Sequence, residues 1–286
     1  MKNFINKEWT VITSNSYSIN LFKDLFLLFK NFFLIKVLLH RDFVSIFKQT
    51  IVGPAWFVIQ PLGTTIVFTV IFGRVAEIST DGLPPFLFYL SGIILWGYFT
   101  SNVGRVSALL FENSHLLNKT YFPIMIIPVT NIIINLFKTS IQVFLFVVFL
   151  IYFKIVGVDF EISIFSFPVL LFCFIVITFL STGIGLIFSS LTIKYKDLNY
   201  VNSFIIGLVM YLTPVVYPLS SAQGKLEILL LLNPITSIVE VLRLFFLGQG
   251  TVETYWLVYS ILFSLLTFYI GYRYFKKISI NFIDTI

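Results

Sequence analysis

The sequence contains few charged residues, one cysteine and two histidines. Only 11% of its 286 residues are Asp, Glu, Lys or Arg, whereas a soluble domain carries about a quarter. Too few polar side chains remain to cover a water-soluble surface. This excludes a soluble enzyme, a nucleic-acid-binding domain and a disordered chain. The single Cys173 also excludes a disulfide framework or a cysteine-built metal site.

Signatures of catalysis are missing as well. With only His40 and His115, the chain has no H-E-x-x-H or comparable metal arrangement, and it has no Walker A sequence. No series of carboxylates runs through its apolar segments, as it does in proton-coupled carriers. We therefore expect no catalytic residue, no metal and no cofactor in this chain, and a pump of this kind must borrow its energy from elsewhere.

Apolar residues are abundant instead. They make up 58% of the chain, with 35 Phe and a mean hydropathy of +0.98. A membrane-spanning helix needs roughly 20 mainly apolar residues. The segments that meet this requirement are 51–72, 86–106, 124–153, 167–191, 201–217 and 255–274. The sequence therefore predicts an all-α integral membrane protein with six transmembrane helices, and we expect no secretory signal peptide before them.

The distribution of Lys and Arg predicts the orientation. If both ends are cytoplasmic, 13 of these residues lie on the inner side and 4 on the outer side. Because cytoplasmic loops carry an excess of Lys and Arg, we expect the N-terminus and the C-terminus both to lie inside.

Residues 20–42 predict an amphipathic helix that does not cross the membrane. Its charged residues, among them Lys23, Lys30 and Arg41, fall within about one third of the helix circumference, with Lys36 and His40 as exceptions. A helix with a charged stripe and a Phe/Leu face lies in the membrane surface. Such an interface helix is either a simple anchor or a cuff around a partner on the cytoplasmic face.

Residues 225–250 form a second apolar stretch that is too short in each half to span. Asn233 is suited to cap a helix that Gly248 ends, and Glu240 and Arg243 can pair on one helix face. Two short helices that dip in from the outer side are typical of a re-entrant element. It either plugs the bundle or gates an exit.

Two stripes stand out inside the spans. The first is polar and is predicted to face other helices or water, unless this part of the helix projects into the cytoplasm: Asn131, Asn135, Lys138 and Gln142. The second consists of small residues suited to close helix packing: Ser181, Gly185 and Ser189. Aromatic residues near the spans are suited to stacking on a sugar polymer, or they simply mark the membrane interfaces.

An ordered set of segments resembles the membrane subunits of bacterial type-2 ABC exporters of surface polysaccharides. These exporters handle O-antigen, teichoic acid and related capsular glycans. The segments are RDFVSIFKQTIVGPAW (41–56), FGRVAEISTDG (72–82), YLSGIILWGYF (89–99), NSHLLNKTYFP (113–123), YKDL (195–198), PVVYPL (214–219) and NPITSIVEVLRLFFLG (233–248).

The resemblance implies a multi-pass protein of the bacterial cytoplasmic membrane that is no enzyme by itself. Its expected partners are a second copy of the chain, two copies of a nucleotide-binding ATPase subunit that bind ATP and Mg, membrane lipid and a lipid-linked glycan; nucleic acid is not among them. The expected division is a cytoplasmic N-terminal segment with the interface helix (1–48), a transmembrane domain (49–277) and a cytoplasmic tail (278–286).

The resemblance also implies roles for particular residues. A coupling helix at about 107–121 would dock on the ATPase through Glu112, Asn113, His115 and Lys119. The channel would be lined by Trp96, Phe99 and Tyr211, and Glu240 and Arg243 would belong to outer gate helices at about 225–250. The alternatives are an ABC exporter of drugs or small lipids, a membrane-embedded transferase that adds glycosyl or acyl groups to a polyprenyl lipid, and a gated channel.

Overall fold

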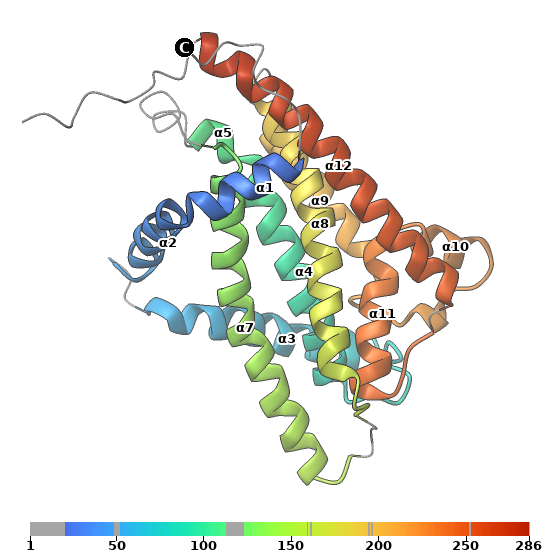
Figure 1. Ribbon diagram of the computed structural model, residues 1–286. Coiled ribbons are helices and arrows are strands. Elements are labelled where there is room, and N and C mark those ends of the chain that lie inside the picture. The colour runs from blue at the N-terminus through green and yellow to red at the C-terminus, as the bar shows by residue number, and fades with distance from the viewer. Residues whose placement is uncertain are drawn as a thin grey trace, which may run out of the picture.

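The computed structural model describes residues 21–48, 52–112, 123–158, 160, 162–193, 195, 197–251 and 253–285. In these ranges the chain is helical and forms no strand, which confirms the all-α class (Figure 1). The elements are α1 (Leu21–Lys30), α2 (Phe32–Phe47), η2 (Gly53–Ala55), α3 (Trp56–Phe68), η3 (Thr69–Val75), α4 (Pro85–Ser107), α5 (Leu109–Glu112), α7 (Ile126–Ile155), α8 (Ser166–Thr192), α9 (Leu198–Tyr211), η4 (Leu219–Ser221), α10 (Lys225–Leu231), α11 (Pro234–Leu247) and α12 (Thr254–Thr285).

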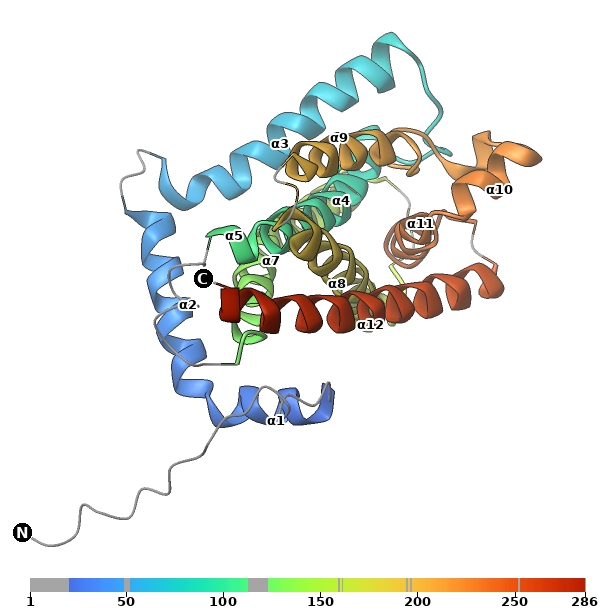
Figure 2. The ribbon, with the colours of Figure 1, turned by 90° about the horizontal axis from the view of Figure 1, so that it is seen from above.

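Helix α4 is the centre of the bundle. It packs against α3, α7, α8, α9 and α11. In its most apolar stretch of 18 residues, 72% is buried, compared with 11% in the corresponding stretch of Gly53–Val75. The apolar surface of α4 is therefore covered by protein, whereas that of α3 is left for lipid or for a partner. Figures 1 and 2 show α3 lying across the outside of the bundle, at a large angle to α4, α7 and α8.

Within the described residues, five segments are long and apolar enough to cross a membrane, or six if the bent pair α10 and α11 counts as one span. The five are Gly53–Val75, α4, α7, α8 and Thr254–Ser279. The ends of these segments lie within a few residues of the predicted ends, except for the C-terminal end of the last segment. Helix α12 continues past residue 274 to Thr285.

The predicted fifth span, 201–217, is wrong in its last six residues. Helix α9 ends at Tyr211 after 14 residues. Pro214 follows closely, and a proline cannot donate the helical hydrogen bond and its ring clashes with the preceding turn. The Tyr211 carbonyl released at the end of the helix accepts a hydrogen bond of 2.8 Å from the hydroxyl of Tyr217.

The predicted single amphipathic helix is also divided in two. Helices α1 and α2 meet in a corner at Asn31 (Figure 2). The Asn31 side chain donates to the Leu27 carbonyl at 2.8 Å, and a local side-chain bond of this kind competes with the helical backbone.

The beginning and the end of the described chain lie together. The Asp24 carboxylate on α1 accepts hydrogen bonds from the Tyr272 hydroxyl at 2.6 Å and from the Lys276 ammonium at 2.5 Å, both on α12. In Figure 1, α1, α2 and α5 lie at the end of the bundle where α12 finishes.

Small residues permit the close packing of α8. A Cβ atom at Gly185 would come within 2.6 Å of the Val106 side chain on α4, so the small-residue stripe is confirmed as a packing surface at this position. A second contact was not predicted. The backbones of Gly183 on α8 and Gly271 on α12 lie so close that neither position has room for a Cβ atom.

Candidate functional site

The two short helices predicted between the last spans form a sharply bent pair. The axes of α10 and α11 differ by 90°. The Asn233 side chain accepts a hydrogen bond from the backbone N–H of Ile235 at 3.1 Å, and Gly248 adopts a left-handed conformation with φ of 73°. The predicted cap and stop of α11 are thus confirmed. We call residues 225–250 the hairpin.

The hairpin lies at the end of the bundle opposite α5. The Ser166 hydroxyl at the start of α8 donates to the Phe245 carbonyl near the end of α11, and the distance is 2.5 Å. At the other end of α8, the Thr192 hydroxyl donates to the carbonyl of Ser107, where α4 finishes, at 3.4 Å. The end of α11 and the connection that follows α4 are therefore separated by the length of α8.

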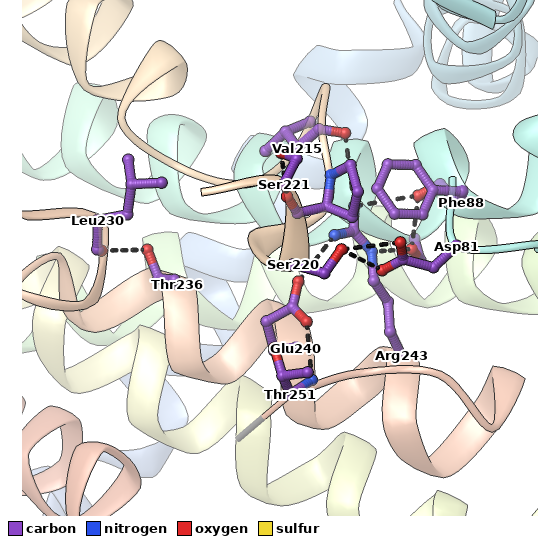
Figure 3. A network of polar contacts seen from close by, with 12 residues as sticks. Asp81, Phe88, Val215, Ser220, Ser221, Leu230, Thr236, Glu240, Arg243 and Thr251 are labelled. Atoms are coloured by element: carbon purple, nitrogen blue, oxygen red, sulfur yellow. Dashed lines mark hydrogen bonds and ion pairs between the residues drawn. The ribbon is translucent and has the colours of Figure 1, made fainter. Parts of the chain in front are cut away.

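A buried ion pair lies within the hairpin, between two residues of α11. An Arg243 guanidinium nitrogen lies 3.1 Å from a Glu240 carboxylate oxygen, and the two side chains are only 1% and 4% exposed. The other carboxylate oxygen accepts from the backbone N–H of Thr251 at 3.2 Å. The predicted pairing of these residues is confirmed (Figure 3).

Arg243 also joins α11 to two other parts of the chain. Its guanidinium donates to the carbonyls of Phe88 on α4 and Val215 after α9, and to the hydroxyl of Ser91, each at 3.4 Å. It stacks on the Phe88 ring, 3.6 Å from the ring centroid. A buried guanidinium requires such partners, because an unsatisfied charge away from water is costly.

Further hydrogen bonds fix the segment that joins α9 to α10. The Ser220 hydroxyl lies 2.8 Å from both carboxylate oxygens of Asp81 (Figure 3). The Asn233 amide donates to the Thr213 hydroxyl at 2.8 Å. Sequence reasoning missed Asp81. It precedes Gly82 in a turn, but this dipeptide gives no indication of a partner far along the chain.

The predicted channel residues differ in their exposure. Trp96 and Phe99 on α4 are 7% and 4% exposed, with ring centroids 5.3 Å apart. Tyr211, at the end of α9, is 67% exposed. The structure brings the first two residues into contact inside the subunit and leaves Tyr211 on its surface, so their role in lining a channel remains a prediction.

A different face of α4 borders open space. A Cβ atom built at Gly97 or at Gly104 would have no other atom within 4 Å. These glycines are two helical turns apart and share one face of the helix. Thr100 and Ser101, which lie between them, are partly exposed. Glycines separated by two turns in an apolar helix are a weak sequence signal, and sequence reasoning did not use it.

The polar stripe of α7 faces neighbouring helices, as predicted. The Asn135 amide donates to the Asn102 side chain at 2.8 Å, and the Ser101 hydroxyl donates to Asn135 at 2.8 Å. One helical repeat further along, the Gln142 amide donates to the Phe57 carbonyl on α3 at 3.3 Å. The stripe thus joins α7 to α4 and to α3.

The structure describes only one of the four predicted coupling residues, Glu112. Helix α5 ends at Glu112, which is exposed, and Leu109 and Leu110 anchor this short helix in the bundle. Asn113, His115 and Lys119 lie outside the described residues.

The interface helix residues lie on the surface of α1 and α2. Lys23, Lys30 and Arg41 are exposed, and Arg41 pairs with Asp42 at 2.7 Å. Several large apolar side chains of the same helices are also exposed: Phe26, Phe29, Phe32 and Phe33. Charged and aromatic side chains on one surface are suited to the membrane interface.

No metal centre is found in the described part of the chain, where no three His, Cys, Asp or Glu residues gather. Cys173 is buried in α8, and its thiol points to the Ile238 carbonyl at 3.7 Å.

A sequence profile described as ABC-2 type transporter matches residues 33–247. The chain belongs to the ABC-2 type transporter family. The matched region begins in α2 and ends with α11, so it includes the central helix α4 and the ion pair of the hairpin. The chain is therefore a multi-pass membrane protein, a transporter permease and not an enzyme.

Curated members of the family resemble the chain over most of their length. The O-antigen export system permease protein RfbA of Klebsiella pneumoniae is 24% identical over 253 residues, 88% of this chain and 95% of that protein. RfbA of Myxococcus xanthus is 25% identical over 205 residues, with coverages of 71% and 75%. The polysialic acid transport protein KpsM of Escherichia coli is 26% identical over 238 residues, with coverages of 83% and 90%.

Proposed function

We propose that the chain is the permease subunit of an ATP-driven exporter that moves a lipid-linked polysaccharide across the cytoplasmic membrane. The observation that carries this proposal is the family match over residues 33–247, together with relatives named for O-antigen export and polysialic acid transport. Deletion of the gene should remove a surface glycan and leave its lipid-linked precursor inside the cell. Loss of drug resistance with an intact surface glycan would contradict the proposal.

The proposed topology has six crossings with both ends in the cytoplasm, and α9 is the short fifth crossing. The excess of Lys and Arg on one side and the contact of Asp24 with Lys276 support this arrangement. Replacing Cys173 by Ser gives a cysteine-free background for labelling with a membrane-impermeant maleimide. In intact cells a cysteine at Glu77 should react, whereas a cysteine at Lys277 should react only after the cells are opened. The opposite result would reverse the orientation.

A second copy of the chain is the proposed partner of α9. This helix exposes Phe204, Leu208 and Tyr211 along one side, and they are 67%, 50% and 67% exposed. A cysteine at Leu208 in the cysteine-free background should form a disulfide-linked dimer in native membranes. A cysteine at Leu262, which is 61% exposed on α12, is the control. Equal cross-linking at both positions would contradict a dimer through α9.

The energy is proposed to come from a separate ATPase subunit, in two copies, that binds ATP and Mg. The exposed Glu112 at the end of α5 supports docking at this end of the bundle, and Asn113, His115 and Lys119 are proposed to contribute to the same contact. The purified permease should hydrolyse no ATP, and its complex with the ATPase should do so. ATP hydrolysis by the permease alone would refute the assignment.

At the opposite end, the hairpin is proposed to act as the outer gate, with Glu240 and Arg243 holding it in place. The route of the glycan is proposed to follow α4, where the open face at Gly97 and Gly104 supports passage. Trp96, Phe99 and Tyr211 are proposed to contact the sugar chain. Exchanging Tyr211 for Ala should slow glycan export, and an unchanged export rate would remove Tyr211 from the route.

A further inference from the structure

Lys138 is a charged residue inside α7, and no carboxylate is paired with it among the described residues. Its ammonium group lies over the Phe57 ring of α3, 5.1 Å from the ring centroid. Contact with a ring is weaker than the interaction with a carboxylate that a lysine at this depth normally finds. The charge therefore lacks a compensating anion within the part of the subunit that the structure describes.

Arg105 is a second cation in the same region. It lies in the last turn of α4 and is partly buried, with no ion pair in the described part of the chain. Both cations lie three residues from the contact between Asn102 and Asn135, close enough for their positive charges to repel each other. Two like charges within a helix bundle each raise the cost of the other, and an anion between them would relieve both.

The helix geometry makes the two side chains converge. Asn135 of α7 contacts Asn102 of α4, while Phe149 of α7 packs on Phe86 at the start of α4, so the two helices are antiparallel. Lys138 and Arg105 each follow the Asn pair by three residues. Because helical side chains lean toward the N-terminus of their own helix, both side chains lean back toward the level of the Asn pair.

The surroundings are open and apolar. A Cβ atom at Gly104, the residue before Arg105, would meet no other atom within 4 Å. Both cations are partly exposed. On α3, which contributes Phe57, Ile59 and Ile66 are exposed at 46% and 53%. Two cations beside an exposed apolar helix suit an anion that carries a hydrocarbon chain.

We propose that Lys138 and Arg105 bind the phosphate of a lipid, namely the lipid that carries the glycan to be exported. A diphosphate linkage offers several acceptor oxygens and two negative charges, so it can satisfy an ammonium and a guanidinium together. The assignment of the lipid rests on the proposed function. In the proposed topology the last turn of α4 faces the cytoplasm, which is the side from which an exported lipid must load.

The test is lipid binding by the full-length protein in detergent, followed by native mass spectrometry. The probes are a long-chain polyprenyl diphosphate, phosphatidylglycerol, and the neutral polyprenol of the same chain length. The variants are Lys138→Met, Arg105→Gln and the charge-conserving Lys138→Arg. Lys154→Met is the matched control, because Lys154 is exposed in the last turn of the same helix.

The protein should retain the diphosphate and not the polyprenol. Loss of one charge-assisted contact should weaken retention about ten-fold or more in Lys138→Met and in Arg105→Gln, whereas Lys138→Arg and Lys154→Met should bind as the unaltered protein does. Equal retention of phosphatidylglycerol, lost in the same variants, would support the phosphate site and assign it to a membrane phospholipid.

Retention of the diphosphate that is the same in all variants would overturn the proposal. Unfolding temperatures within a few degrees of the unaltered protein would show that a variant that fails to bind is folded. Lysine-to-arginine rescue provides a second check. Failure of the proposed function is a separate result, because it would appear as normal surface glycan after gene deletion, whatever the purified protein binds.

Discussion

Removal of the Arg243 charge should destabilise the protein strongly. In Arg243→Met the buried Glu240 loses its ion-pair partner, and the carbonyls of Phe88 and Val215 lose a donor. Breaking a buried pair by removing one partner costs about 3–5 kcal/mol. With roughly 2–4 °C per kcal/mol for a chain of this size, the unfolding temperature in detergent should fall by about 6–20 °C.

The double variant Glu240→Gln/Arg243→Met tests the reason for this effect. It removes both charges and keeps an oxygen that can accept from the Thr251 N–H, so it should recover at least half of the lost stability. Arg74→Met, at an exposed arginine in η3, should change the unfolding temperature little. If the single and double variants unfold at the same temperature, an uncompensated charge is not the cause. If Arg243→Met behaves like Arg74→Met, Arg243 does not hold the hairpin to the bundle.

Three further changes test other parts of the structure. Gly183→Ala should lower the unfolding temperature and the yield of folded protein, because its Cβ would meet the α12 backbone near Phe268 at 2.5 Å. Gly207→Ala is the control and should change neither, because a Cβ at Gly207 has open space. Equal effects of the two substitutions would contradict the close packing of α8 and α12. Asp24→Asn should speed backbone hydrogen exchange in α1 and leave the exchange rate in α8 unchanged. The reason is that Asn keeps an acceptor for Tyr272 but loses the charge that binds Lys276. An unaltered exchange rate in α1 would show that this contact does not hold the helix. Glu112→Lys should uncouple ATP hydrolysis by the partner subunit from glycan export without altering the fold, because the residue is exposed, and normal export would remove it from the docking surface.

The apolar character of the spans made most of the helices predictable. A run of roughly 20 apolar residues has few alternatives to a membrane helix, and the expected ends of α4, α7 and α8 agree with the structure. Local rules also predicted the Asn233 cap and the Glu240–Arg243 pair, since both depend on residues two or three positions apart.

Contacts between distant segments could not be predicted in this way. Nothing local to Asp81 indicates Ser220, and nothing local to Gly183 indicates Gly271. The last six residues of the predicted fifth span were wrong for a related reason. Hydropathy measures the apolar character of 212–217 but not the geometry that Pro214 imposes. It also gives no information on the side chains that hydrogen-bond to the carbonyls left free at the end of the helix.

The contact between Gly183 and Gly271 leaves α8 and α12 little freedom to slide past each other. Helices that touch backbone to backbone cannot slide without colliding, so α8 and α12 must tilt together as a single rigid plate. The lightly covered α3 and the short α9 have no such interlock among the described contacts. We therefore expect α3 and α9 to shift more readily than α8 and α12, and spectroscopic distance probes on these helices would test this.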